Sequence, residues 1–115
     1  MRHKRKIRKL GRNKSQRKSL TVNLTISLFR DKKVRTTTAR ARQVKRLAEK
    51  MITLGKQTEA GSDQKIMASL GSSAMVKVVK AVAEKYRDRQ GGYTRAVKMP
   101  ARRGDGAAMV LLQLV

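Results

Sequence analysis

The stretch TTTARARQVKRLAEKMITLGK, residues 36–56, predicts the central helix of the fold. Its apolar residues recur at the three- and four-residue spacing of one buried helical face, namely Ala41, Val44, Leu47, Ala48, Met51 and Leu54. Thr37 or Thr38 can cap its start, and Gly55 stands where a left-handed stop is expected. The remaining faces carry one acid, Glu49, among the bases Arg40, Arg42, Lys45, Arg46 and Lys50. This bias toward one sign favours contact with an anionic partner over simple solvation.

The preceding segment SLTVNLTISLF, residues 19–29, fits two structures. Leu20, Val22, Leu24, Ile26 and Leu28 alternate with polar residues, as in a half-buried strand. The same segment stacks two apolar stripes at helical spacing, at positions 20, 24, 28 and at 22, 26, 29. The period alone favours the strand and leaves the helix open. Between this segment and the central helix, β-branched residues at 34–37 predict a brief strand.

After the central helix, the pattern predicts a loop and two more helices. Residues 56–62 are polar and contain Gly61, as expected of a loop. The apolar residues Ile66, Met67 and Leu70 indicate one or two helical turns that end at Gly71. Ser72 or Ser73 then caps a helix whose apolar face comprises Met75, Val78, Val79, Val82 and Tyr86. The methionines at 51, 67 and 75 are expected to fill gaps in the core.

The last part of the chain predicts an antiparallel hairpin. Residues 93–99 alternate well enough for a strand, residues 109–115 form a second and more hydrophobic one, and residues 100–106 between them are rich in turn formers. The tripeptide Arg103-Gly104-Asp105 is best explained as part of this turn and not as an integrin ligand. Helices gathered between flanking strands are typical of a two-layer α+β domain.

The first eighteen residues, MRHKRKIRKLGRNKSQRK, contain ten lysines and arginines and no acid. Past Met1, their only apolar residues are Ile7 and Leu10, too few to offset the entropy of ordering this segment by itself. We therefore expect a disordered or extended basic arm over residues 1–14 that binds nucleic acid, followed by one compact α+β domain over residues 15–115.

The charge of the whole chain supports a polyanionic partner. The chain contains thirty lysines and arginines and seven acidic residues, which gives a formal net charge of +23. The aromatic residues are only Phe29, Tyr86 and Tyr93, too few for a platform that stacks successive bases. Arginine and lysine contacts to phosphates fit this composition better. An architectural DNA-binding protein is the alternative, although no segment shows a clear wedge or recognition helix.

The sequence gives no support for an enzyme, a cofactor, a metal site or a membrane span. The one histidine, His3, lies in the basic arm, the chain has no cysteine, and the seven acids are scattered. Gly91-Gly92 lacks the lysine of a phosphate-binding loop, so no small-molecule substrate is expected. No stretch approaches the roughly 18 apolar residues of a transmembrane helix.

Several strings together resemble one family. MRHK at 1–4, KLGRN at 9–13, the stretch 36–56, YRDRQGGYTR at 86–95 and RRGD at 102–105 occur in the order of the L-seventeen family of bacterial-type large-subunit ribosomal proteins. The resemblance implies a helix–strand–three-helix–two-strand order, and therefore a helix at residues 20–29. It also implies binding to large-subunit ribosomal RNA near the nascent-chain exit, beside other large-subunit proteins. The expected location is a cytoplasmic ribosome, with an organellar ribosome as the open alternative.

The basic segments and the family strings together define the residues that we expect to bind RNA. Asp63-Gln64-Lys65 replaces a more arginine-rich opening of the third helix, so no contact is assigned there. The expected RNA-binding residues are Arg2, His3, Lys4, Arg5, Lys6, Arg8, Lys9, Arg12, Asn13, Lys14, Arg17, Lys18, Arg35, Arg40, Arg42, Lys45, Arg46, Tyr93, Arg95, Lys98, Arg102 and Arg103.

Overall fold

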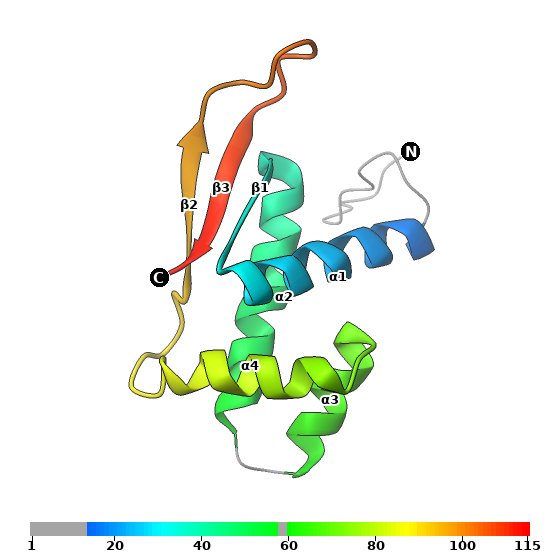
Figure 1. The fold of residues 1–115 in the computed structure, drawn as a ribbon, viewed down its shortest axis with the longest axis vertical. Helices are drawn as coiled ribbons and strands as arrows, with labels where there is room; N and C mark the ends of the chain where they lie inside the picture. The colour runs from blue at the N-terminus through cyan, green and yellow to red at the C-terminus, as the bar shows by residue number, and fades with distance from the viewer. Residues whose placement is uncertain (1–13, 58–59) are drawn as a thin grey trace, which may run out of the picture.

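The computed structural model describes residues 14–57 and 60–115 (Figure 1). Along the chain these residues form α1 (Lys14–Asp31), β1 (Lys33–Thr37), α2 (Thr38–Lys56), α3 (Ala60–Leu70), α4 (Ala74–Glu84), β2 (Thr94–Met99) and β3 (Met109–Leu114). This order confirms the α+β class and the predicted sequence of helix, strand, three helices and hairpin. Residues 1–13, which make up most of the predicted basic arm, lie outside the described residues.

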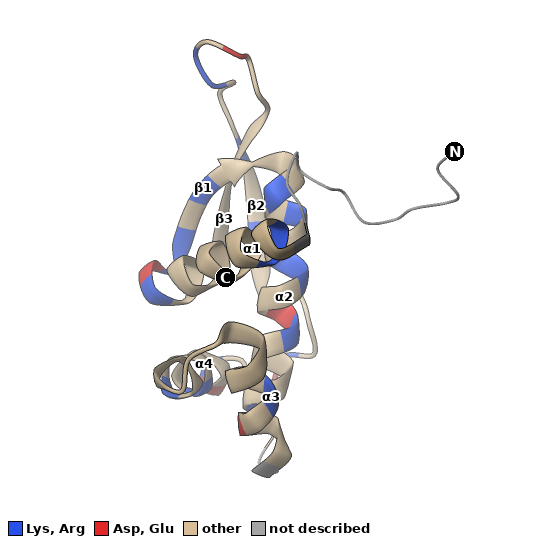
Figure 2. Ribbon diagram, turned by 90° about the vertical axis from the view of Figure 1, so that its right-hand side faces the viewer, with Lys and Arg blue, Asp and Glu red and all other residues tan. Residues whose placement is uncertain are grey.

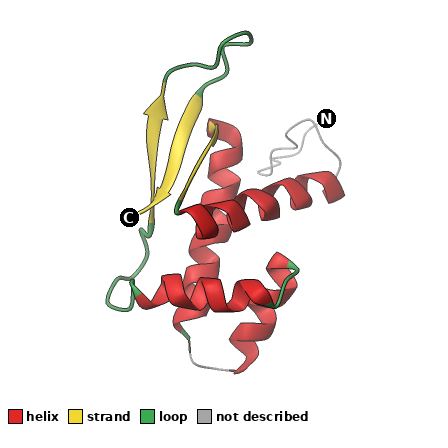
Figure 3. Cartoon of the chain, viewed as in Figure 1, coloured by secondary structure: helices red, strands yellow, loops and turns green. Residues whose placement is uncertain are grey.

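The three strands form one antiparallel sheet in the order β1-β3-β2. β2 and β3 pair from Thr94 opposite Leu114 to Met99 opposite Met109, which confirms the hairpin. β1 pairs with the other edge of β3, from Lys33 opposite Gln113 onward. Figure 3 shows the strands on one side of the molecule and the helices on the other. Among the described residues, helices therefore cover only one face of the sheet.

Residues 20–29 are helical, as the family resemblance implies, and the strand favoured by their period is wrong. α1 packs against both α2 and β1, so it needs apolar residues on more than one side. Leu28 and Phe29 are fully buried at its end. Thr25, also fully buried, donates its hydroxyl to the Thr21 carbonyl at 2.7 Å. A hydroxyl residue that bonds back to the preceding turn can occupy a helix interior, so Thr25 fits α1 although it contributes to the strand-like alternation.

α2 begins as predicted but does not end at Gly55. The Thr37 hydroxyl caps its start by accepting a hydrogen bond from the Arg40 amide at 3.4 Å. The helix continues through Gly55, which has no positive φ, to Lys56. A Cβ placed on Gly55 would lie 3.0 Å from the Cβ of Ala83. The glycine therefore allows α2 and α4 to approach each other closely, and the predicted left-handed stop is wrong.

α3 and the start of α4 differ from the expectation in three ways: the length of α3, the cap of α4 and the exposure of Met67. α3 begins at Ala60, inside the segment expected to be a loop, and ends as predicted before Gly71, whose φ is +69°. Ser73 precedes α4 but makes no side-chain capping hydrogen bond. Met67 is 39% exposed and does not fill the core, whereas Met51 and Met75 are buried as expected.

The core lies between the helices and the covered face of the sheet. Side chains from every layer meet there, and the largest fully buried ones include Phe29, Met51, Ile52, Ile66, Val79 and Leu112. This arrangement fixes the backbone of α2 and of the strands, so that their outward-facing residues hold defined positions.

Candidate RNA-binding surface

Four exposed cations follow one face of α2: Arg42, Lys45, Arg46 and Lys50. Residues three and four apart share a helical face, and this one lies opposite the buried Val44, Ala48 and Met51. We call these four residues the basic α2 face (Figure 2). Among the described residues, no acid forms an ion pair with them. Their charges are thus available to an anionic ligand. The expected site included all of them except Lys50, which the i+4 spacing from Arg46 could have indicated.

The single acid of α2, Glu49, is held by the sheet. The hydroxyl of Thr94 on β2 donates to the Glu49 carboxylate at 2.8 Å, and Thr94 is only 6% exposed. This contact joins residues 45 positions apart, so no local pattern could have predicted it. Because the carboxylate is directed to β2, it does not neutralise the neighbouring cations of the basic α2 face.

The start of α1 carries the predicted residues Lys14, Arg17 and Lys18. Arg17 is half-buried and Lys18 is exposed. Lys18 also lines a hollow of about 290 Å³ between α1 and the end of α3. Since residues 1–13 lead directly into this end of α1, the arm and the helix are continuous along the chain.

The loop between β2 and β3 carries two predicted arginines with different surroundings. Arg102 donates Nε and Nη2 to the two carboxylate oxygens of Asp105, at 3.1 and 2.6 Å. Asp105 also accepts from the Ala107 amide at 3.1 Å. These hydrogen bonds, chiefly the one from Arg102, lower the pKa of Asp105 from 3.8 to about 2. Arg103 is exposed beside this ordered turn, and the loop projects from one end of the sheet (Figure 2).

Arg95 and Lys98, which were both expected to bind RNA, lie on opposite faces of the sheet. Lys98 lies opposite Val110, which faces the helices, whereas Arg95 belongs to the alternate set that faces away from them. Arg35 on β1 lies on the same outward face as Arg95. Arg35 and Arg95 can therefore act together, but Lys98 presents its charge on the other face.

Tyr93 is 2% exposed and belongs to an internal cluster. Its hydroxyl accepts a hydrogen bond from Lys56 Nζ at 3.0 Å, and its ring centroid lies 5.3 Å from that of Tyr86. The hydrogen bond from Lys56 lowers the pKa of Tyr93, while burial raises that of Tyr86. Lys56 also donates to the Arg89 carbonyl. In this structure the ring of Tyr93 offers no face to RNA, and it holds the segment between α4 and β2 in place.

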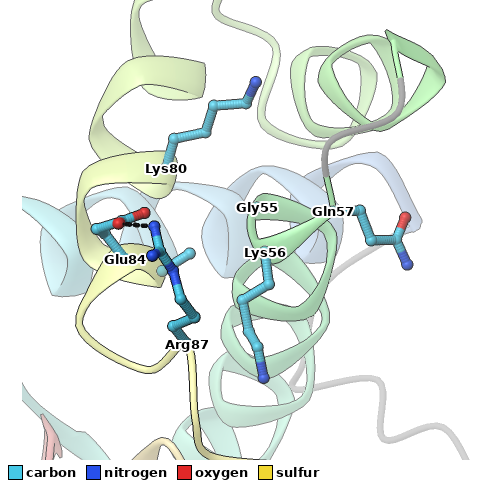
Figure 4. Close-up of a pocket in the computed structure, with 7 residues that line it drawn as sticks. Gly55, Lys56, Gln57, Lys80, Glu84 and Arg87 are labelled. Carbon is cyan, nitrogen blue, oxygen red and sulfur yellow. Dashed lines mark hydrogen bonds and ion pairs between the residues drawn. The ribbon is translucent and has the colours of Figure 1, made fainter.

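A hollow of about 500 Å³ lies between the end of α2 and α4 (Figure 4). Its charged lining is already paired, because Arg87 forms an ion pair with Glu84 and Lys80 lies 2.6 Å from Asp63. Lys56, at its edge, donates to Arg89 and Tyr93. The charged residues that line this hollow are therefore less available to an anionic ligand than the cations of the basic α2 face.

The described part of the chain contains no candidate metal site and no single helix that could span a membrane. It contains no group of three or more histidines, cysteines or acids that could hold a metal ion. No single helix within residues 14–57 and 60–115 has the length and apolar content to cross a membrane, although the bent pair 61–70 and 74–84 passes on length and composition alone.

Comparison with known proteins identifies the family. The family described as Ribosomal protein L17 matches residues 20–115. The large ribosomal subunit protein bL17 of Natranaerobius thermophilus is 48% identical over 109 residues, which cover 94% of this chain and 96% of that protein. The protein of the same name from Desulfitobacterium hafniense is 49% identical with 94% and 97% coverage, and that from Fusobacterium nucleatum is 40% identical with full coverage of both. The family match and the similarity to these relatives both show that the chain belongs to the ribosomal protein L17 family.

Proposed function

We propose that the chain is a structural constituent of the large ribosomal subunit that binds and clamps large-subunit ribosomal RNA. Its family consists of ribosomal proteins, and the relatives above are named as proteins of the large subunit. The chain is accordingly a structural protein and not an enzyme. The observation that carries the RNA-binding role is the basic α2 face, four exposed cations with no acid paired to them in the described residues.

The expected mechanism is neutralisation of phosphates with release of counterions. The basic α2 face holds one RNA segment, while Arg17, Lys18 and the arm over residues 1–14 hold another. If six to ten phosphates are neutralised, affinity should fall by roughly 10³–10⁵ between 50 and 200 mM salt, by analogy with duplex DNA. Specificity then comes mainly from RNA shape and 2′-hydroxyl contacts, since side chains cannot read the deep, narrow major groove of A-form RNA.

The same proposal includes a position for the protein. It would lie near the nascent-chain exit, beside other large-subunit proteins, in a cytoplasmic ribosome. Support comes from the family strings at residues 1–13, 86–95 and 102–105 and from the bacterial source of the relatives.

Competition binding tests the RNA-binding role against the alternative of an architectural DNA-binding protein. The labelled full chain is bound to a large-subunit ribosomal RNA fragment and competed with unlabelled fragment or with duplex DNA of equal phosphate content. We expect the RNA to compete at much lower concentration. Equal competition, or preference for the duplex, would contradict the proposal.

Removal of residues 2–13 tests the arm separately and leaves α1 intact. The truncated protein should bind the RNA fragment more weakly, because seven lysines and arginines are lost. Its thermal unfolding should be nearly unchanged, because the described core residues and the apolar residues packed against them all lie at position 22 or later. Unchanged RNA affinity would show that the arm does not take part in binding.

A further inference from the structure

The face of the sheet that is turned away from the helices combines an apolar centre with a basic border. Along β3, Val110 and Leu112 face the helices and are 6% and 0% exposed. Because side chains alternate along a strand, Met109, Leu111 and Gln113 face the opposite way. In the part of the chain that the structure describes, no helix lies on this side of the sheet (Figure 1). We call this surface the outer sheet face.

Cross-strand register fixes which residues meet on the outer sheet face. Leu111 lies between Arg35 of β1 and Val97 of β2, and Met109 lies opposite Met99. Four apolar side chains thus form a continuous strip on two strands: Val97, Met99, Met109 and Leu111. Val97 is 39% exposed, among the most exposed large apolar residues described.

The border of the strip is cationic, and a hydrogen bond from Arg95 to Gln113 holds part of it in place. Gln113 lies between Lys33 of β1 and Arg95 of β2. With the Gln113 amide turned so that its oxygen faces Arg95, that oxygen accepts from Nε at 3.1 Å and from Nη2 at 2.6 Å. None of the three strands contains an acid. The strip is therefore bordered by Lys33, Arg35 and Arg95 without a compensating carboxylate.

The strip continues into a hollow at the end of the sheet. This hollow of about 540 Å³ is lined by Met99 and Met109, by Arg35, and by the loop residues Pro100 and Arg103, among others. Methionine side chains adapt readily to irregular apolar partners. The apolar strip thus leads into the hollow through Met99 and Met109, with Arg95 near one end and Arg103 at the other.

We propose that the outer sheet face binds an extended segment of a neighbouring protein that carries both apolar and acidic side chains. An RNA strand would satisfy the cations but leave the strip without an apolar partner, since the strip has no aromatic ring for base stacking. A second copy of this chain, at net charge +23, and the acid-free residues 1–13 are both repelled by the border. An acidic, apolar segment complements the centre and the border together.

This inference rests on the proposed ribosomal role only for the presence of neighbouring proteins, and its test is separate. The probe is a synthetic peptide of alternating leucine and glutamate, added to the isotope-labelled full chain at moderate salt. We expect amide chemical-shift changes concentrated at Val97, Met109 and Leu111. Peptides with glutamine in place of glutamate should bind more weakly, because they lack the charge that complements the basic border. Peptides with serine in place of leucine should also bind more weakly, because they lack the apolar side chains that cover the strip.

Two serine variants provide a matched pair. Val97 and Met67 are both 39% exposed, but Met67 lies on α3, away from the sheet. Val97→Ser should weaken peptide binding about tenfold through lost apolar burial. Met67→Ser should change it by less than about twofold, as for a surface residue outside the contact. The shift mapping uses the unmodified chain and stands even if a variant folds poorly.

Three results would overturn the proposal. They are peptide-induced shifts concentrated on the basic α2 face, equal effects of Val97→Ser and Met67→Ser, and displacement of the peptide from the outer sheet face by a ribosomal RNA fragment. The last result would keep the proposed RNA-binding function and assign this face to RNA. Peptide binding at the strip without any binding of ribosomal RNA would instead support this inference and remove the proposed function.

Discussion

Gly55 of α2 lies directly against Ala83 of α4, so close that a Cβ on Gly55 would stand 3.0 Å from the Ala83 Cβ. It would also lie 3.1 Å from Val79 Cγ1 and 3.3 Å from the Val79 carbonyl oxygen. Such distances require the neighbours to move, and a backbone carbonyl inside a helix moves with difficulty. The contact holds the two helices together and so positions the opposite, basic face of α2.

Replacement of this glycine should therefore destabilise the domain. Alanine is favoured over glycine inside a helix by about 1 kcal/mol, but overpacking costs about 1–3 kcal/mol, so we expect Gly55→Ala to lose about 1 kcal/mol. Gly61 provides the control, because it is helical with nothing within 4 Å of its Cβ position. Gly61→Ala should gain about 0.5 kcal/mol. Urea unfolding measures both, and stabilisation by Gly55→Ala would contradict the close packing.

The two tyrosines should ionise separately. The pKa of Tyr93 lies below its ordinary value of 10.0 because Lys56 donates a hydrogen bond to it, and that of Tyr86 lies above it because of burial. The chain contains no tryptophan, so its ultraviolet absorbance reports the tyrosines. As pH rises, tyrosinate absorbance should increase in two steps, with Tyr93 ionising first. Tyr93→Phe should remove the earlier step, and Lys56→Met should move it to higher pH. A single step near the ordinary value would contradict the cluster.

These shifts also set opposite dependences of stability on pH. The lowered pKa of Tyr93 means that its contribution is present above about pH 10 and lost as pH falls through the folded-state value. The raised pKa of Tyr86 means that its contribution is present below about pH 10 and lost as pH rises through its folded-state value. Unfolding of Tyr93→Phe and Tyr86→Phe across this range should show changes of opposite sign.

The hairpin turn should lose its order only in strong acid. The pKa of Asp105 is lowered from 3.8 to about 2, so its contribution is complete above pH 3.8 and lost as pH falls through about 2. Carboxyl chemical shifts should give a midpoint near 2 for Asp105. In Arg102→Gln the midpoint should return toward 3.8, because Arg102 is the largest cause of the shift. An unchanged midpoint in that variant would show that the turn alone lowers the pKa.

The basic α2 face should dominate the salt dependence contributed by the domain. The triple variant Arg42→Gln, Lys45→Gln, Arg46→Gln should reduce the slope of log affinity against log salt by roughly 2–3. The control removes three exposed lysines outside that face, Lys65→Gln, Lys77→Gln and Lys85→Gln. It loses the same charge but should change the slope by less than about 1. Equal slopes in the two variants would indicate diffuse attraction by net charge.

The sequence was sufficient where local periodicity and tertiary packing agree. The apolar face of α2, the threonine cap at Thr37, the stop at Gly71 and the hairpin of β2 and β3 all follow from short-range patterns. Four cations of the central helix could be grouped in the same way, because helical spacing alone places them on one face.

Periodicity failed where distant packing decides the structure. Residues 20–29 alternate like a strand yet lie in α1. Because α1 packs against several elements, its apolar residues lie on more than one side and fit both a strand and a helix period. Only the family resemblance identified the helix. Gly55 met the local rule for a helix stop but serves the contact with α4. Arg95 and Lys98 were both expected to bind RNA, although the alternation of the predicted strand already implies the opposite faces that they occupy on β2. The Thr94–Glu49 contact joins residues 45 positions apart, beyond any local signal.

Co-sedimentation with ribosomal subunits tests the central claim most directly. The tagged full chain, its basic α2 face variant and the lysine control are expressed in bacterial cells, and subunits are separated on gradients at increasing salt. We predict that the full chain stays with the large subunit through a high-salt wash, and that the α2 variant is released at lower salt than the control. Recovery of the full chain free of the large subunit, or with the small subunit alone, would contradict the account.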